Sequence, residues 1–120
     1  MDQRVQVLIV NHEVHTRQGL QALLAAWPQI EVVGAANGVE AIQQMEKCQP
    51  DVALMDIPMP VMEGLEAIRL IKSRQPQVRI VVLTMYATHR AAALAAGADA
   101  LLLKGCPAEA LQDALLKPRG

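Results

Sequence analysis

Short runs of apolar residues alternate along the chain with longer segments of helical periodicity. Five runs rich in Val, Ile, Leu and Ala have the length and the continuous apolar character of strands that are buried on both faces. These predicted strands are Val5–Val10, Glu31–Ala35, Val52–Met55, Arg79–Leu83 and Ala100–Leu103. Because strands that alternate with helices are typical of βαβ units, we expect a parallel sheet with helices on both sides.

The segments between these strands predict five helices. Apolar side chains of the first recur at the spacing of one helix face, and the pattern ends before Pro28. The markers of the helices are Leu20, Leu23, Leu24 and Trp27; Ala41, Ile42 and Met45; Leu65, Ile68 and Ile71; the alanine-rich residues 88–96, with Gly97 as a C-terminal cap; and Leu111 and Leu115, after Pro107. Leu116 falls beside the last of these stripes, and we expect it to be exposed.

The fold class that follows is α/β, with a doubly wound, five-stranded parallel sheet. Right-handed crossovers and short connections favour the strand order 2-1-3-4-5, which is flavodoxin-like. A length of 120 residues fits one domain, so we expect residues 1–120 to form a single unit. The winding reverses between the first and third strands, and ligands of open α/β sheets bind beyond the carboxyl ends of the strands at such a reversal.

Composition and charge exclude several classes of function. The formal net charge of −1 offers no basic surface for a phosphate backbone, so we expect no direct binding of nucleic acid. No apolar run approaches the roughly eighteen residues of a membrane span, and the N-terminus lacks the pattern of a signal peptide. We therefore expect a cytoplasmic protein without membrane contact. Cys48 and Cys106 lack metal-ligand spacing and receive no role.

Polar residues lie at the carboxyl ends of four predicted strands, which meet at one edge of a parallel sheet. They are Asn11, His12 and Glu13 after the first strand, Asp56 after the third, Thr84 at the end of the fourth and Lys104 at the end of the fifth. A carboxylate, a hydroxyl and an ammonium group suit the handling of a phosphoryl group: the carboxylate attacks phosphorus, and the other two bind the phosphoryl oxygens. One Asp after a strand is an ordinary loop residue, but the whole set favours the functional interpretation.

The segment Asp56-Ile-Pro-Met-Pro-Val-Met-Glu-Gly64 resembles the phosphoacceptor loop of response regulator receiver domains. The resemblance extends over essentially the whole chain and is closest to receivers of the NarL/LuxR type. It implies a non-enzymatic domain of a two-component phosphorelay that regulates a transcriptional or protein output, with a sensor histidine kinase as partner. By position it implies Asp56 as phosphoacceptor, Thr84 as switch hydroxyl, Lys104 as phosphate-binding lysine and the backbone carbonyl of Pro58 as a metal ligand.

The chain departs from this family at the metal corner. Receivers usually carry two adjacent acidic residues after the first strand, which hold Mg²⁺ together with the phosphoacceptor, and Asn11 and His12 stand at those positions. Since Mg²⁺ is held mainly by carboxylate charge, we expect its binding to be weak or absent, and we expect Glu13 to point away from the corner. His12 suits a softer ion such as Zn²⁺ or Mn²⁺, although a loop histidine without a metal is the simpler interpretation.

Two further departures concern signalling. Leu101 stands where receivers carry the aromatic residue of their rotamer switch, and the interval from Thr84 to Gly97 is two residues shorter than the resemblance leads us to expect. Both favour an alternative function, a pseudo-receiver that docks or dimerises independently of phosphorylation. If the domain forms a homodimer, we expect the contact through the fourth helix, fifth strand and fifth helix, or through the first and fifth helices.

Two other classes of protein fit the residues less well. A dehalogenase-like phosphatase needs a second carboxylate two residues after its nucleophile, where this chain has Pro58. A flavodoxin-like carrier of flavin mononucleotide needs Ser, Thr and Gly after the first strand, where this chain has Asn11, His12 and Glu13. The phospho-switch and the pseudo-receiver therefore remain as the two hypotheses.

Overall fold

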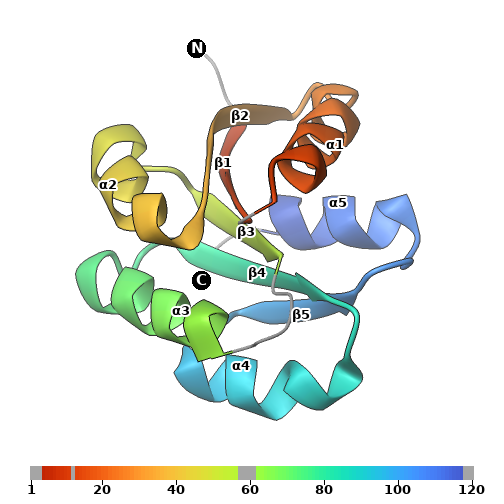
Figure 1. The fold of residues 1–120 in the computed structure, drawn as a ribbon. Helices are drawn as coiled ribbons and strands as arrows, with labels where there is room; N and C mark the ends of the chain where they lie inside the picture. Colours follow the sequence, from red (N-terminus) through yellow and green to blue (C-terminus); the bar gives the residue numbers. More distant parts are fainter. Residues whose placement is uncertain (1–3, 12, 57–61, 118–120) are drawn as a thin grey trace.

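The computed structural model describes residues 4–11, 13–56 and 62–117. Five parallel strands form one sheet in the predicted order β2-β1-β3-β4-β5 (Figure 1). The strands are β1 (Val5–Val10), β2 (Ile30–Ala36), β3 (Val52–Asp56), β4 (Arg79–Thr84) and β5 (Ala100–Leu103). One face is covered by α1 (Val14–Ala25) and α5 (Ala108–Leu116), and the other by α2 (Gly38–Cys48), α3 (Met62–Arg74) and α4 (Arg90–Ala96), which follows the 3-10 turn η1 (Ala87–His89). The predicted α/β class is confirmed.

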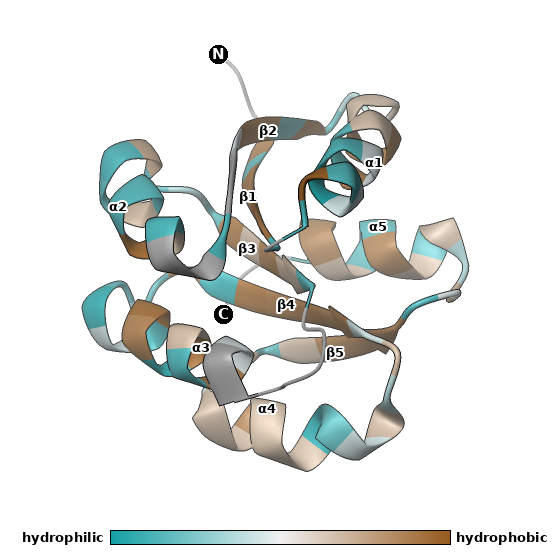
Figure 2. Ribbon diagram, in the orientation of Figure 1, coloured by the Kyte–Doolittle hydropathy of each residue, from teal (hydrophilic) through white to brown (hydrophobic). Residues whose placement is uncertain are grey.

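Aliphatic side chains fill the space on both faces of the sheet. Successive residues of a strand point to opposite faces, so Val7 and Ile9 pack with α1 and α5, whereas Leu8 and Val10 pack with α2 and α3. Every residue of β3 and β4 is buried. Figure 2 shows the strands as the most hydrophobic part of the ribbon. The prediction that the strands are buried on both faces is therefore confirmed for the centre of the sheet.

The first helix differs from its prediction at its C-terminal end. It ends at Ala25. Trp27 lies beyond this end, and its backbone N–H donates to the carbonyl of Leu24. Leu20, Leu24 and Trp27 pack on the core, but Leu23 is 39% exposed. Successive residues are about 100° apart around the helix axis. Leu23 therefore lies at the edge of the apolar stripe, whereas Leu24 lies at its centre.

The last helix also differs from its prediction. Leu116 was expected to be exposed, but it is half-buried and packs against the cluster that contains Leu111 and Leu115. The apolar face of α5 is thus wide enough to include a side chain beside the main stripe. Among the helices of the described ranges, none is both long enough and apolar enough to cross a membrane.

The connections around α4 depend on one glycine and one carboxylate. Gly97 ends α4 with φ of 121°, where a Cβ atom would lie 2.8 Å from Lys72 Cγ. Asp99 accepts hydrogen bonds from the backbone N–H of Ile80 at 2.8 Å and pairs with Lys72 Nζ at 2.9 Å. Partial burial alone would raise the pKa of Asp99, but these partners hold that pKa below its ordinary value. The start of β5 is thereby fixed against β4 and α3.

The two leucines of α1 provide a matched test of the packing. Replacement of the fully buried Leu24 with Ala should lower the free energy of unfolding by about 2–5 kcal/mol, because it leaves a cavity between α1 and the sheet. Replacement of Leu23 with Ala should cost less than about 1 kcal/mol. Urea unfolding followed by circular dichroism measures both values. Equal losses would show that α1 packs on the sheet through a different face.

Candidate functional site

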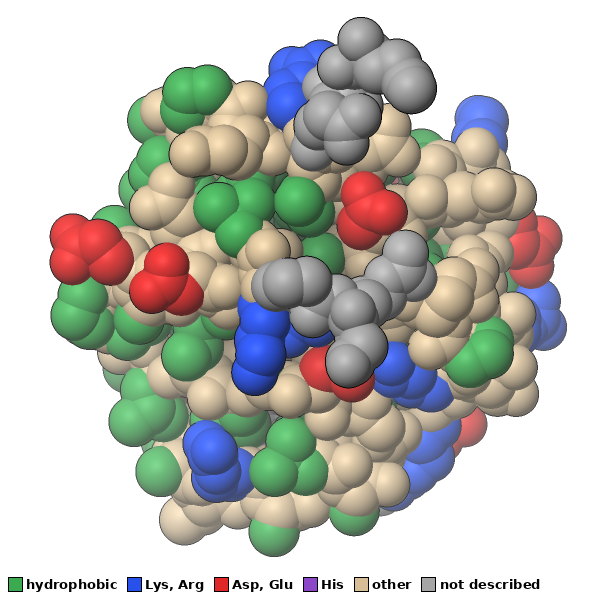
Figure 3. All heavy atoms as spheres, turned by 180° about the vertical axis from the view of Figure 1, so that it is seen from behind, with side chains coloured by type: hydrophobic (Ala, Val, Ile, Leu, Met, Phe, Trp, Pro, Cys, Tyr) green, Lys and Arg blue, Asp and Glu red, His purple; other side chains and the backbone are tan. Residues whose placement is uncertain are grey.

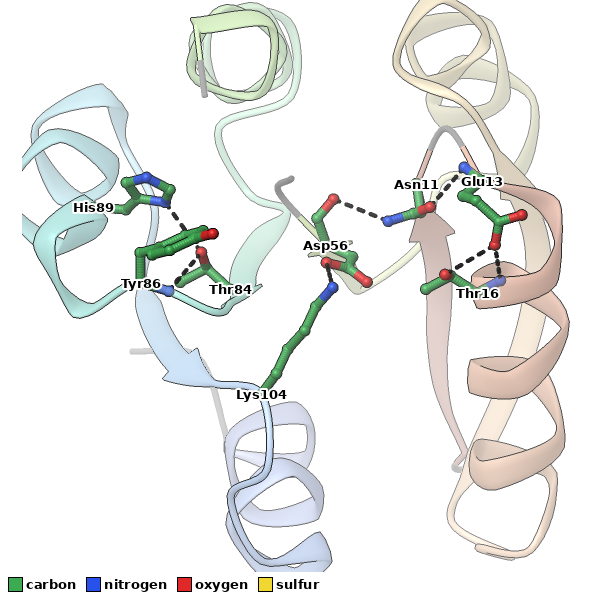
Figure 4. A network of polar contacts seen from close by, with 8 residues as sticks. All are labelled: Asn11, Glu13, Thr16, Asp56, Thr84, Tyr86, His89 and Lys104. Atoms are coloured by element: carbon green, nitrogen blue, oxygen red, sulfur yellow. Dashed lines mark hydrogen bonds and ion pairs between the residues drawn. The ribbon is translucent and has the colours of Figure 1, made fainter. Parts of the chain in front are cut away.

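The parallel register brings the predicted site residues to one edge of the sheet. Asp56 is the last residue of β3 and is paired in register with Leu83, and Thr84 is the last residue of β4 and is paired with Leu103. Both residues were expected just at the strand ends, and both lie inside the ladder. Each of the two residues is thus held by one neighbouring strand, β4 for Asp56 and β5 for Thr84. Figure 4 shows the side chains at this edge.

Asp56 and Lys104 form an ion pair across the end of β4. The Asp56 side chain is 1% exposed, and Lys104 Nζ lies 2.7 Å from its Oδ1 atom. Neither carboxylate oxygen has a hydrogen-bond partner within the described part of the chain. A buried charge is costly unless it is compensated, so the nearby ammonium stabilises the ionised carboxylate. Among the described residues, the Oδ2 atom remains a buried acceptor without a partner.

The side chain of Asn11 is turned toward the backbone. Its Nδ2 atom donates to the carbonyl oxygen of Asp56 at 3.2 Å, and its Oδ1 atom accepts from the backbone N–H of Glu13 at 2.6 Å. The guanidinium of Arg17 donates to the Asn11 carbonyl at 2.6 Å. The side-chain amide of Asn11 thus donates one hydrogen bond and accepts another, which fixes its orientation. Asn11 joins the ends of β1 and β3.

Glu13 acts as the N-cap of α1. Its carboxylate accepts hydrogen bonds from the backbone N–H groups of Thr16 at 2.7 Å and His15 at 3.1 Å, and from the Thr16 hydroxyl at 3.0 Å. The backbone hydrogen bonds from Thr16 and His15 lower the pKa of Glu13 below its usual value. These contacts agree with the expectation that Glu13 points away from Asp56 (Figure 4).

Thr84 contacts a residue that the sequence did not single out. Its hydroxyl oxygen lies 3.0 Å from Nδ1 of His89 and accepts a hydrogen bond from the backbone N–H of Tyr86 at 3.3 Å. Thr84 is fully buried and His89 is 9% exposed. The rings of Tyr86 and His89 are in tilted contact, with centroids 5.2 Å apart. The available signal was a histidine five residues after Thr84 within an otherwise alanine-rich segment.

Leu101 lies in the core. It is 7% exposed and packs in the cluster on the side of α3 and α4. Its neighbour on the same face of β5 is Leu103, which is 43% exposed. The predicted loss of an aromatic side chain at position 101 thus leaves an aliphatic residue fixed by packing. His12 and Pro58, the two other residues of the predicted metal corner, lie outside the described residues.

A small pocket adjoins the ion pair on the side of α1 and α5. Its volume is about 190 Å³, and Lys104 lines one wall. The other walls are mostly apolar and are formed by Leu20, Leu23, Leu83, Gly105, Cys106, Ala108 and Leu111. The exposed Leu23 therefore faces an opening between the first and last helices.

The fold and this edge define an open, doubly wound α/β domain in which a buried carboxylate is paired with a partly exposed ammonium group at the switch point. A family model described as "Response regulator receiver domain" matches residues 7–116. The chain belongs to the response regulator receiver domain family. The predicted resemblance to receivers of the NarL/LuxR type is thereby confirmed.

Three relatives illustrate the similarity. The transcriptional regulatory protein DegU of Brevibacillus brevis is 38% identical over 95% of this chain and 50% of its own length. The response regulator protein VraR of Staphylococcus aureus is 37% identical over 94% of this chain and 56% of its own length. The receiver domain of a putative response regulator NarL from Mycobacterium tuberculosis has a TM-score of 0.82 at 26% identity, covering 97% of this chain and 99% of that one. The chain thus spans about half the length of the curated relatives.

The described residues do not fit the Mg²⁺ ion that receiver domains generally bind. Asp56 Oδ2 is a suitable ligand, but Asn11 uses its amide on the backbone and Glu13 caps α1. Within residues 4–11, 13–56 and 62–117, no group of three or more His, Cys, Asp or Glu side chains is placed to hold a metal ion. Oxygen ligands with negative charge are what Mg²⁺ requires, and this corner supplies one carboxylate.

Proposed function

We propose that Asp56 is the phosphoacceptor of a receiver domain whose phosphorylation controls an output, and that residues 1–120 act together as this domain. The observation that carries the proposal is the buried Asp56 carboxylate: Lys104 Nζ lies 2.7 Å from Oδ1, and Oδ2 has no partner within the described part of the chain. A buried acceptor without a partner is costly in a folded protein and is common where a ligand or a reaction supplies the missing contact. The Lys104 ammonium compensates the charge of the carboxylate, which is the form that acts as a nucleophile.

The chemistry is the transfer of a phosphoryl group to a carboxylate oxygen. Asp56 Oδ2 attacks phosphorus, the bond between phosphorus and the donor breaks, and the donor leaves with its bonding electrons. An acyl phosphate remains on Asp56. The ammonium of Lys104, whose side chain is 31% exposed, then pairs with a phosphoryl oxygen in place of the carboxylate. The donor is a sensor histidine kinase in the cytoplasm.

The output that we propose is transcription. DegU and the uncharacterized protein YhcZ of Bacillus subtilis are transcriptional regulatory proteins by name, and each extends well beyond the region matched here. A module that docks independently of phosphorylation is not favoured by these relatives. It also gives no reason for a buried carboxylate and a buried hydroxyl at neighbouring strand ends.

Phosphorylation by acetyl phosphate tests the proposal. The parent chain should gain the mass of one phosphoryl group, and Asp56→Asn should gain none, because its amide is not a nucleophile. Lys104→Gln should be phosphorylated several-fold more slowly, since the phosphoryl oxygens lose their counter-charge. Intact-mass spectrometry at neutral pH measures all three rates. Equal labelling of the parent and of Asp56→Asn would assign the phosphoryl group to another residue and reject the proposal.

We further propose that Mg²⁺ binds only weakly at this corner, because Asn11 and His12 supply no negative charge. The double variant Asn11→Asp/His12→Asp should bind Mg²⁺ roughly tenfold more tightly or better, as followed by amide shifts near Asp56. A matched control adds two charges at exposed glutamines, as Gln29→Glu/Gln43→Glu, and should bind as the parent does. Saturation of the parent below the cellular concentration of Mg²⁺ would contradict the weak binding.

Any homodimer should use one of two exposed apolar surfaces. Leu23 faces the pocket between α1 and α5, whereas Leu94 lies on α4 and is 41% exposed. Figure 3 shows apolar side chains on the side where α1 and α5 lie, with acidic side chains among them. Exposed apolar side chains of this kind are common at contacts between copies.

Two single variants distinguish the surfaces. If copies associate through α1 and α5, Leu23→Glu should weaken the dimer at least tenfold and Leu94→Glu should leave it unchanged, because a buried, unpaired carboxylate is costly. Association through α4, β5 and α5 predicts the reverse. Sedimentation of the phosphorylated chain over a range of concentrations gives the dissociation constants. A dimer that tolerates both variants would use neither surface.

A further inference from the structure

The Thr84 hydroxyl has one proton, and Nδ1 of His89 lies within hydrogen-bonding distance of its oxygen. A hydroxyl group donates once and accepts through its lone pairs. The Thr84 oxygen accepts from the N–H of Tyr86 at 3.3 Å and lies 3.0 Å from His89 Nδ1. The side chain is fully buried, and Nδ1 is an acceptor in the His89 tautomer that carries its proton on Nε2. Donation from Thr84 to Nδ1 leaves a lone pair of the Thr84 oxygen for the N–H of Tyr86.

A phosphoryl group on Asp56 requires the same proton. Phosphoryl oxygens only accept hydrogen bonds, so the Thr84 hydroxyl can bind them only by donating. Figure 4 shows the hydroxyl directed toward His89 and the Tyr86 amide, while Asp56 and Lys104 lie on the other side of Thr84. The backbone of Thr84 is fixed, because its carbonyl accepts from the N–H of Lys104 at 2.7 Å. The hydroxyl can therefore change partners only by rotation of the side chain.

His89 connects this hydroxyl to the start of α4. It ends the 3-10 turn that begins at Ala87, and α4 begins at the next residue, Arg90. Four residues separate Thr84 from His89, so the short connection brings the imidazole back onto the strand end. The imidazole also contacts the half-exposed ring of Tyr86. Loss of the contact between Thr84 and His89 would free both the turn and the Tyr86 ring.

We propose that His89 is a positioning residue that holds the Thr84 hydroxyl, so that a phosphoryl group on Asp56 has to displace His89 and thereby releases the start of α4. This inference rests on the proposed role of Asp56. It supplies a route from the phosphorylation site to α4 in a domain whose β5 carries Leu101 and Leu103 in place of an aromatic side chain on that face. His89 opposes activation until the hydroxyl changes partner.

The first experiment needs no phosphoryl group. Ring nitrogen resonances of His89 should show Nδ1 as a hydrogen-bond acceptor in the parent and in Thr84→Ser, and should shift in Thr84→Val, which has no hydroxyl. The Thr84→Val change nearly preserves side-chain volume, and dispersed amide spectra show whether each variant is folded. Identical Nδ1 resonances in the parent and in Thr84→Val would overturn the hold on Thr84, whether or not Asp56 accepts a phosphoryl group.

The second experiment measures competition, with beryllofluoride at a fixed Mg²⁺ concentration as the phosphoryl analogue. His89→Phe keeps a ring but has no acceptor, so it should tighten beryllofluoride binding roughly three- to tenfold, the equivalent of one hydrogen bond. His89→Asn places an amide oxygen near the position of Nδ1 and should bind as the parent does. In a Thr84→Val background, His89→Phe should have no effect. If His89→Phe does not fold, His89→Leu takes its place.

The amides of α4 report the release. Beryllofluoride should shift the resonances of residues 90–96 in the parent, and His89→Phe should show part of the same shift without beryllofluoride. If His89→Phe tightened beryllofluoride binding equally with and without the Thr84 hydroxyl, His89 would act only through packing. Absence of beryllofluoride binding in every variant, together with no labelling of Asp56 by acetyl phosphate, would reject the competition and the proposed function together. Labelling of Asp56 that His89→Phe leaves unchanged would reject the competition alone.

Discussion

Burial of the sheet on both faces is the constraint on which the arrangement of this protein depends. All positions of β3 and β4 are buried by aliphatic side chains of five helices, so a charged side chain on these strands is tolerated only at their ends. At the amino-terminal end of β4, Arg79 donates to the carbonyl oxygens of Ala114 and Lys117. At the carboxyl end of β3, Asp56 has the ammonium of Lys104. Each strand end thus requires a partner from a distant part of the chain, and those partners fix α5 and β5 in place.

The polar edge has a different charge from that expected of a receiver with an intact acidic pair. Two neutral or nearly neutral residues stand where two carboxylates would, so fewer negative charges face Asp56. The change has two opposite effects on phosphoryl transfer. It removes ligands for a divalent cation, and it also removes repulsion between the site and an incoming phosphoryl anion. Asn11 instead donates a hydrogen bond to the Asp56 carbonyl, which connects the ends of β1 and β3.

The end of β4 connects this edge of the sheet to α4. The backbone of Thr84 is part of the sheet. Its hydroxyl contacts His89, the residue directly before α4, because the connection between them is short. Both side chains are at least nine-tenths buried, so their hydrogen bond is not weakened by competition with water. A change at the strand end can therefore reach the helix without an aromatic side chain on β5. Small buried rearrangements have discrete alternatives in a close-packed core, which is what a switch requires.

The sequence by itself determined the strands, the sheet order, the family and the convergence of Asp56, Thr84 and Lys104, because hydrophobic periodicity and parallel strand order are local or topological properties. Tertiary structure decided what the side chains contact. The orientation of the Asn11 amide, the burial of Leu116 and the hydrogen bond between Thr84 and His89 depend on groups that are distant in sequence or on the tightness of one turn. The type of a residue determines which hydrogen bonds its side chain can form. Which partner it actually has depends on the packing of the chain in three dimensions.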